Sequence, residues 1–321
     1  MIADADALAD RRRLKRRLSF WRIVAGLALL GALLLAILAG TGTAEIGKMR
    51  DHIARIRVSG VIADVDNYTK LIEKLRKDDR VKAVIVDVNS PGGTTAGSEV
   101  LYNSLRELAG KKPVVTTMGT VAASGGYITA IAGDQIFALG NTTTGSIGVI
   151  LQWPQITDLL AKLGVSVKEI KSGPLKAEPS PFTPLTDEVR RVTQSLVDDS
   201  YRWFIGLVAE RRGMDIEDVK QVADGRVFTG RQAVDVGLVD ALGGEKEAVE
   251  WLTSRRGIPE GLKVVDWSVS ETKDLGLGAR VARYVLTGLG LGGFYDTLEK
   301  TIGAERLSLD GLISIWHPND Y

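Results

Sequence analysis

Two kinds of hydrophobic pattern alternate along the chain after about residue 53. Short apolar runs rich in β-branched residues predict strands at residues 53–62, 81–88, 113–118, 135–139 and 165–170. Amphipathic stretches between them predict helices at residues 67–79, 98–110 and 124–134. The run at 81–88 is almost continuously apolar, which is typical of a strand buried on both faces. This alternation predicts an α/β fold with parallel strands joined by right-handed crossover helices.

The pattern changes in the last third of the chain. Residues 186–212 carry apolar positions near helical spacing and predict one long helix, which we expect to pack on the core or on another subunit. Beyond Gly244 the periodicity weakens. Residues 273–321 combine a glycine-rich apolar stretch with a polar tail and support no assignment.

The N-terminal residues have the pattern of a membrane anchor. Seven basic residues lie between Arg11 and Arg22, and the 17 residues from Ile23 to Ala39 carry no charge. As a helix rising ~1.5 Å per residue this run covers roughly 26 Å, close to the thickness of a bilayer's hydrocarbon core. Because only four basic residues follow soon after the run, we expect the N-terminus in the cytoplasm and the rest of the chain outside. A cleavable signal peptide is the alternative, since residues 42–44 resemble a small-residue cleavage site.

Composition excludes several kinds of chemistry. The 41 basic and 40 acidic side chains leave a net charge of +1, which gives no indication of a nucleic-acid partner. The chain contains no cysteine and only two histidines, so disulfides, thiol catalysis and most zinc sites are excluded. We expect neither a cofactor nor a metal. An enzyme of this composition would work with hydroxyls, amines and carboxylates.

Ser124 is a candidate nucleophile. It lies in TVAASGGYITA, between two alanines and two glycines, where a predicted strand passes into a predicted helix. Small neighbours let a substrate approach such a hydroxyl, and free backbone amides at a sharp turn can hold an oxyanion. A serine that simply caps a helix is the alternative. Gly93, in the NSPGG turn after the strand at 81–88, is a candidate oxyanion donor, with an ordinary turn as the alternative.

A serine nucleophile needs a base. His52 and His317 belong to no motif, so a Ser-His-Asp triad is not expected. A lysine can replace histidine if burial lowers its pKa from ~10.4. Lys176 is the candidate, because SGPLKAEPSPFTPLT is a proline-rich loop with apolar neighbours. The side chain of Glu178 should point away from it, since a nearby carboxylate would raise the pKa of a lysine.

Four motifs in sequence order resemble the short form of bacterial signal peptide peptidase A. They are VNSPGG, TVAASGGYITA, NTTTGSIGVI and SGPLKAEPSPFTPLT, and the resemblance covers about residues 53–244, with RVFTGRQAVDVGLVDALGG near its end. It implies that Ser124 is the nucleophile, Lys176 the general base, Gly93 an oxyanion donor and Ser146 a residue that orients the lysine amine. It also implies a βαβ spiral of the Clp protease and crotonase type, assembled into a homo-oligomeric ring in which a neighbouring subunit supplies the lysine.

The expected protein is a membrane-anchored serine endopeptidase. We expect a cytoplasmic basic segment at 1–22, a transmembrane anchor at 23–44, a protease domain at 45–250 and a C-terminal extension at 251–321. The resemblance implies apolar peptide substrates, such as remnant signal peptides, on the extracytoplasmic side of the bacterial cytoplasmic membrane. Two alternatives stay open: a non-catalytic membrane scaffold, and a crotonase-like acyl-CoA enzyme on the same fold.

Overall fold

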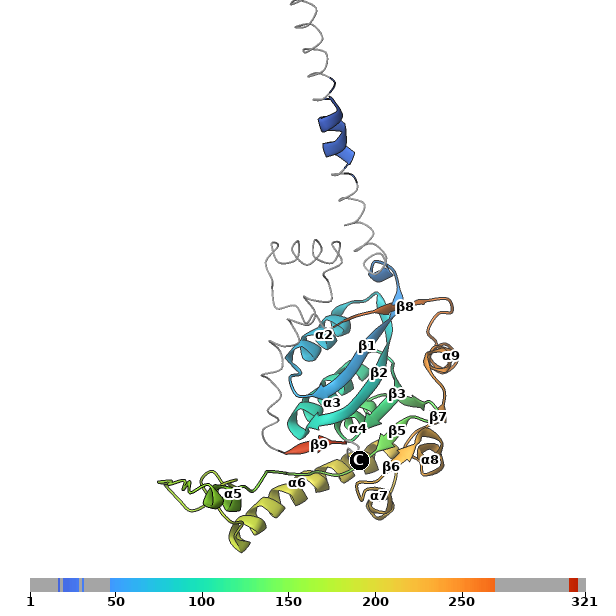
Figure 1. Cartoon of the computed structure of the whole chain (residues 1–321). Coiled ribbons are helices and arrows are strands. Elements are labelled where there is room, and N and C mark those ends of the chain that lie inside the picture. Colours follow the sequence, from blue (N-terminus) through green and yellow to red (C-terminus); the bar gives the residue numbers. More distant parts are fainter. Residues whose placement is uncertain (1–16, 18–19, 29–30, 32–46, 269–311, 317–321) are drawn as a thin grey trace, which may run out of the picture.

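The computed structural model describes residues 17, 20–28, 31, 47–268 and 312–316 of the chain. Its body is a twisted sheet with helices packed on it (Figure 1). The strands are β1 (His52–Ile62), β2 (Val81–Thr94), β3 (Val114–Ala123), β4 (Gln135–Ala138), β5 (Thr143–Gly145), β6 (Val227–Thr229), β7 (Ala241–Leu242), β8 (Lys263–Asp266) and β9 (Ile313–Ile315). The helices are α2 (Asp66–Lys77), α3 (Thr95–Ala109), α4 (Gly125–Ala130), α5 (Thr157–Lys162), α6 (Asp187–Arg212), α7 (Ile216–Val222), α8 (Gly230–Asp235) and α9 (Glu245–Arg256).

The sheet is mixed. Its main path runs β6-β5-β3-β2-β1-β8, while β4 pairs with β3 and β7, and β9 pairs with β2. The pairs β1–β2, β2–β3 and β3–β4 are parallel, as the alternation of strands and helices predicted. The pairs β5–β6 and β2–β9 are antiparallel. The α/β class is therefore confirmed, and parallel pairing holds for its centre rather than for every strand.

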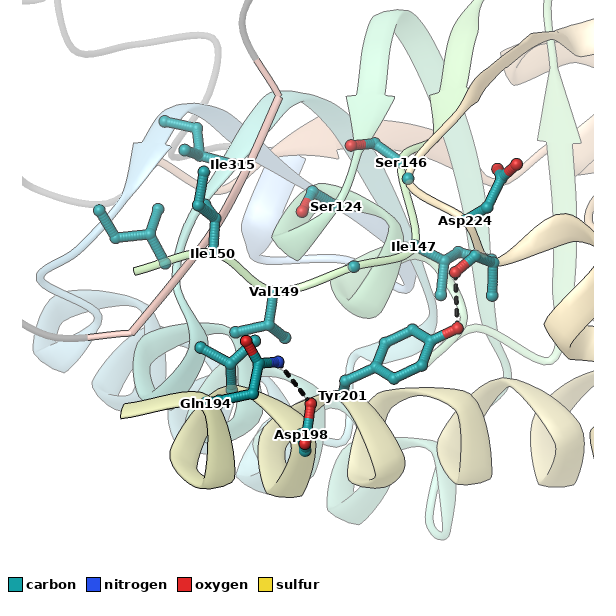
Figure 2. A pocket seen from close by; sticks show the side chains of 15 residues that line it. Ser124, Ser146, Ile147, Val149, Ile150, Gln194, Asp198, Tyr201, Asp224 and Ile315 are labelled. Atoms are coloured by element: carbon teal, nitrogen blue, oxygen red, sulfur yellow. Dashed lines mark hydrogen bonds between the residues drawn. The ribbon is translucent and has the colours of Figure 1, made fainter. Parts of the chain in front are cut away.

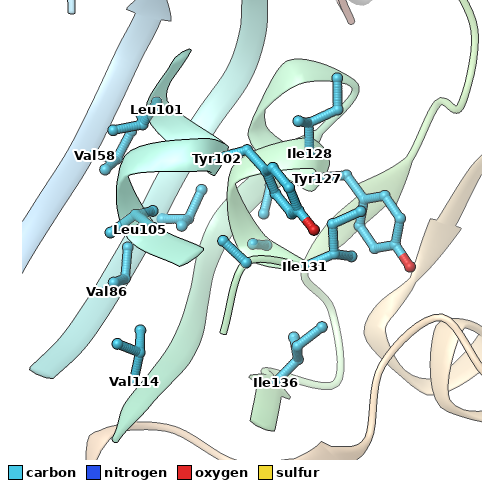
Figure 3. Packing of buried hydrophobic residues seen from close by; sticks show 14 of the residues in the cluster. Val58, Val86, Leu101, Tyr102, Leu105, Val114, Tyr127, Ile128, Ile131 and Ile136 are labelled. Atoms are coloured by element: carbon cyan, nitrogen blue, oxygen red, sulfur yellow. The ribbon is translucent and has the colours of Figure 1, made fainter. Parts of the chain in front are cut away.

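Alternating side chains of the central strands pack on opposite faces of the sheet. Val84, Val86 and Val88 of β2 lie in a core shared with α2, α3 and α4. Figure 3 shows Val86 in this core with side chains of α3 and α4. Ala83 and Ile85 of the same strand lie in a second core, which α9 covers. Burial on both faces explains why the sequence of β2 is apolar almost throughout instead of alternating.

Two predictions about individual segments are wrong. Residues 165–170 form no strand, and Val165, Val167 and Ile170 are exposed. They follow α5 in a part of the chain that projects beyond the sheet, where they pair with none of the described strands (Figure 1). The NSPGG segment at 89–93 is not a turn, since β2 continues to Thr94. The end of β1 keeps it extended, because Val61 and Ile62 pair with Gly92 and Gly93 after a shift in register.

The other predicted helices and strands are present in the structure. The predicted helix at 186–212 is α6, and the short helix after Ser124 is α4. The C-terminal extension adds β8 beside β1 and β9 beside β2. Most of the expected transmembrane anchor at 23–44 lies outside the described residues, and within the described part of the chain no helix combines the length and apolarity needed to span a bilayer.

Candidate active site

Ser124 lies at a sharp turn between β3 and α4. Its backbone angles are φ 55° and ψ −117°, a conformation that costs a residue with a side chain about 1–3 kcal/mol. The turn is held by its own amide, which donates to the carbonyl of Gly145 at 2.8 Å, and by its carbonyl, which accepts from the amide of Ile128 at 2.9 Å. The Ser124 side chain is 1% exposed and makes no capping hydrogen bond to α4. The serine stands at the N-cap position of α4, but its side chain does not cap the helix, and its strained backbone directs the hydroxyl elsewhere.

Gly92 and Gly93 bring the end of β2 against this turn. Gly92 has φ +113°, and a methyl carbon built on it would lie 2.8 Å from the amide nitrogen of Gly125. A methyl carbon on Gly93 would lie 1.9 Å from the carbonyl oxygen of Ile62. Neither position can hold a side chain without a shift of the backbone. These two glycines allow the end of β2, the end of β1 and the start of α4 to meet.

The backbones of Gly93 and Gly125 lie against each other beside Ser124. A methyl carbon built on Gly125 would lie 3.1 Å from the Gly93 nitrogen and 3.0 Å from the carbonyl oxygen of Ser314. The buried hydroxyl of Ser90 supports the segment, because it donates to the Gly60 carbonyl at 2.6 Å and accepts from the Gly92 amide at 3.1 Å. Two backbone donors next to a serine hydroxyl are the elements of an oxyanion hole. Gly93 is a candidate donor from the sequence, whereas the roles of Gly125 and Ser90 are not predicted, although both residues lie inside the same two motifs.

Ser146 is held near Ser124 because the preceding residue, Gly145, accepts a hydrogen bond from the Ser124 amide. It follows β5 with φ 48°, and its amide donates to the carbonyl of Arg226 at 2.8 Å. It is 9% exposed, and within the described residues its hydroxyl has no hydrogen-bond partner. Ser124 and Ser146 line one cavity of about 490 Å³, whose opposite wall is α6 (Figure 2). A polar hydroxyl is thus available for a further group that enters this cavity.

Lys176 lies apart from that cavity. Its side chain is exposed, in the segment that projects with α5 near the start of α6 (Figure 1). Within the described residues its amine makes no ion pair. The carboxylate of Glu178 is engaged by other groups, because it accepts from Lys171 at 2.8 Å and from the amide of Ser180 at 2.9 Å. The Lys171 hydrogen bond holds the pKa of Glu178 below its usual value, and the hydrogen bonds that Lys171 donates to Glu169 and then to Glu178 raise the pKa of Lys171.

The histidine that the structure describes belongs to a different part of the molecule. His52 is the first residue of β1, at the amino end of the parallel strands, whereas Ser124 follows the carboxyl end of β3. Its Nδ1 lies 2.7 Å from the Arg50 carbonyl oxygen, and its Nε2 accepts from the Trp267 indole at 3.0 Å. His52 is buried, and both of its ring nitrogens have partners within the fold, away from Ser124. His317 lies outside the described residues.

A strand from the C-terminal extension fills the space in front of Ser124. The hydroxyls of Ser314 and Ser124 are 2.5 Å apart, and the Ser314 hydroxyl also donates to the Gly148 carbonyl at 3.2 Å. Ser314 belongs to β9, which pairs with the end of β2 on one edge and with Ile150 on the other. The sequence of residues 273–321 supports no assignment, and it therefore does not predict this contact. Among the described residues no group of acidic or histidine side chains could hold a metal ion.

Comparison with known proteins identifies the class. The model of peptidase family S49 matches residues 106–258, a range that contains Ser124, Ser146 and Lys176. The chain is 43% identical to a "Putative protease" of Synechocystis sp. over 65% of this chain and 76% of that protein. It is 37% identical to a "Putative signal peptide peptidase SppA" of Enterococcus faecium over 72% of this chain and 70% of that protein. It is 35% identical to "Protease 4" of Haemophilus influenzae over 68% of this chain and 37% of that protein.

These matches define a serine protease, and the turn that carries Ser124 is consistent with that class. The chain belongs to peptidase family S49, together with the protein named as a putative signal peptide peptidase.

Proposed function

We propose that the chain is an endopeptidase in which Ser124 attacks the peptide bond and Lys176 of a neighbouring subunit is the general base. The strained turn that presents Ser124 beside the backbones of Gly93 and Gly125 is the observation that carries the proposal. It supplies a hydroxyl and two backbone donors in a small, enclosed space. The membership of family S49 supports the reaction type.

The proposed reaction proceeds through an acyl-enzyme. The neutral amine of Lys176 takes the proton from the Ser124 hydroxyl while its oxygen attacks the carbonyl carbon of the substrate. The Gly93 and Gly125 amides stabilise the negative oxygen that forms. The lysine ammonium then gives its proton to the leaving amine as the peptide bond breaks. Water, deprotonated by the same amine, hydrolyses the ester and frees Ser124.

The exposure of Lys176 supports a shared site. Its segment projects from the body of the subunit, and the first half of α6 beside it exposes Val192 and Leu196, which are one helical turn apart. An apolar strip of this kind suits contact with another subunit. In a ring, every interface would then combine Ser124 and Ser146 of one chain with Lys176 of the next, and the unpaired Ser146 hydroxyl could accept from the arriving amine.

We further propose that residues 23–44 anchor the protease to the bacterial cytoplasmic membrane, with residues 45–321 on the extracytoplasmic side and apolar peptides, such as remnant signal peptides, as substrates. The charge asymmetry around the apolar run supports this orientation. Protease added to spheroplasts should degrade the domain, and alkaline carbonate should leave it in the membrane fraction. Protection in spheroplasts, or release by carbonate, would contradict the anchor.

Covalent labelling tests the central proposal. A fluorophosphonate should label the wild-type chain at Ser124 and leave Ser124→Ala unlabelled. Ser254→Ala is a matched control, since Ser254 is an exposed serine on α9. Labelling should be accompanied by hydrolysis of a peptide library. A folded wild-type protein that neither reacts nor cleaves any peptide would favour the non-catalytic scaffold, and turnover of an acyl-CoA thioester would favour the crotonase-like alternative.

A further inference from the structure

The strand β9 lies in the candidate active site in the manner of a bound peptide. One edge pairs antiparallel with β2, where Ser314 is opposite Gly93 and Ile313 is opposite Thr94. The other edge bonds to Ile150 through two hydrogen bonds, from the Ile313 amide at 3.1 Å and from the Ile150 amide at 3.0 Å. Addition of an extended peptide to a sheet edge is a recurrent mode of peptide recognition, and here both edges of the peptide are satisfied.

The register places the Ser314 carbonyl at the Gly93 amide and next to Gly125. The Thr95 amide donates to the Leu312 carbonyl at 3.1 Å, and the Trp316 amide donates to the Pro91 carbonyl at 2.6 Å. Because hydrogen-bonded pairs alternate in an antiparallel ladder, the pair between them, Gly93 with Ser314, is also a hydrogen-bonded one. The Gly93 amide therefore donates to the Ser314 carbonyl, and the Ser314 oxygen would lie 3.0 Å from a methyl carbon built on Gly125, which places it beside the residue after Ser124.

The side chain of Ser314 is enclosed. It is 1% exposed, and its hydroxyl contacts the Ser124 hydroxyl and the Gly148 carbonyl. The neighbouring Ile313 and Ile315 are only partly buried and line the large cavity, whereas Ser314 does not. A leucine or phenylalanine at the same register would have to displace the Ser124 hydroxyl or the Gly148 backbone. An alanine would fit without such movement.

We propose that β9 is a built-in substrate mimic and that the groove selects peptides with a small residue, of alanine or serine size, at the position of Ser314, flanked by aliphatic residues. The inference rests on the proposed role of Ser124. The bond to be cleaved follows the small residue: its carbonyl is transferred to the Ser124 oxygen, the next residue leaves as a free amine, and water then yields the carboxylate.

Synthetic peptides with the sequence of residues 309–319 test this specificity. The full-length protein should cleave the peptides with serine or alanine at the position of Ser314, and leucine or phenylalanine there should lower kcat/KM at least about tenfold. Cleavage should occur after that residue, as mass spectrometry of the products would show. Equal rates for the alanine and leucine peptides, or cleavage elsewhere, would overturn the proposal.

A pair of variants tests the occupancy of the groove by β9. Ser314→Leu should prevent β9 from seating, and so should raise the rates of fluorophosphonate labelling and of cleavage of the alanine peptide severalfold. Ser254→Leu makes the same change on exposed α9 and should leave both rates at the wild-type value. Unchanged rates in Ser314→Leu would refute occupancy by β9. Absence of labelling in both variants would refute the proposed role of Ser124 instead, which separates the two hypotheses.

Discussion

The hydroxyl of Ser124 lies 2.5 Å from the hydroxyl of Ser314, a residue 190 positions later in the chain. The contact is buried, and Ser314 is held by a strand that pairs on both of its edges. The candidate nucleophile is therefore covered by the chain's own C-terminal extension. Kinetic measurements on this protein would begin from an occupied groove, so substrate affinity should include the free energy of displacing β9.

The strain at Ser124 predicts a difference between two inactive variants. Ser124→Ala keeps a β-carbon at φ 55°, whereas Ser124→Gly removes it. Both variants should lose fluorophosphonate labelling and peptide hydrolysis. In urea denaturation, Ser124→Gly should unfold with a free energy up to about 1 kcal/mol higher than Ser124→Ala. A less stable glycine variant would show that the native backbone is not strained at this residue.

Gly93 should not tolerate alanine. The added methyl carbon would lie 1.9 Å from the Ile62 carbonyl oxygen, so the end of β2 must shift and carry the Gly93 amide away from the oxyanion position. We expect turnover to fall by about 10²–10³-fold, as for the loss of an oxyanion donor. Gly110→Ala is the control, because its nearest contact would be an ordinary 3.5 Å and its φ is −67°. Comparable activity of the two variants would show that Gly93 is not an oxyanion donor.

Lys176→Arg should be inactive. A guanidinium stays protonated at any usable pH and accepts no proton from a serine. The control is Lys168→Arg, since Lys168 is an exposed lysine in the same projecting segment. Its peptide hydrolysis should match that of the wild type. Wild-type turnover by Lys176→Arg would exclude Lys176 as the base.

Complementation tests whether two chains form each site. Ser124→Ala and Lys176→Ala should be inactive alone, because each lacks one member of every site. Dissociation and reassembly of an equal mixture should restore both groups at about one site in four by random assortment in a closed ring. Peptide cleavage by the mixture measures this recovery. Mixed rings without any activity would show that Ser124 and its base come from one chain.

The segment that carries Lys176 should loosen at acid pH. The pKa of Glu178 is lowered by its hydrogen bond to Lys171, so the stabilisation is present above the usual carboxyl pKa of ~4.3 and is lost as pH falls through the lower folded value. Glu178→Gln should abolish this dependence and raise amide hydrogen exchange at residues 169–183 already at neutral pH. Glu260→Gln, at an exposed position, is the control. Equal hydrogen exchange in both variants would show that Glu178 does not stabilise this segment.

The residues of β2 and α6 show how far the sequence predicts this fold. The apolar run at 81–88 indicated a doubly buried strand, and the helical spacing at 186–212 indicated one long helix, because both patterns follow from local periodicity. Residues 165–170 have similar β-branched content and yet form no strand. A strand forms only where it can pair with the edge of a sheet, and the sequence of this segment does not indicate whether such an edge lies nearby.

The sequence by itself determined the α/β class, the position of Ser124 at a junction of strand and helix, and the glycines that surround it, since these depend on neighbouring residues and their backbone preferences. The tertiary structure decided which distant groups share the site. It brought the amides of Gly93 and Gly125 together, placed Ser314 against Ser124, and left Lys176 exposed in a projecting segment. These contacts depend on sheet register and on packing between residues far apart in the chain, and no local pattern of side chains encodes them.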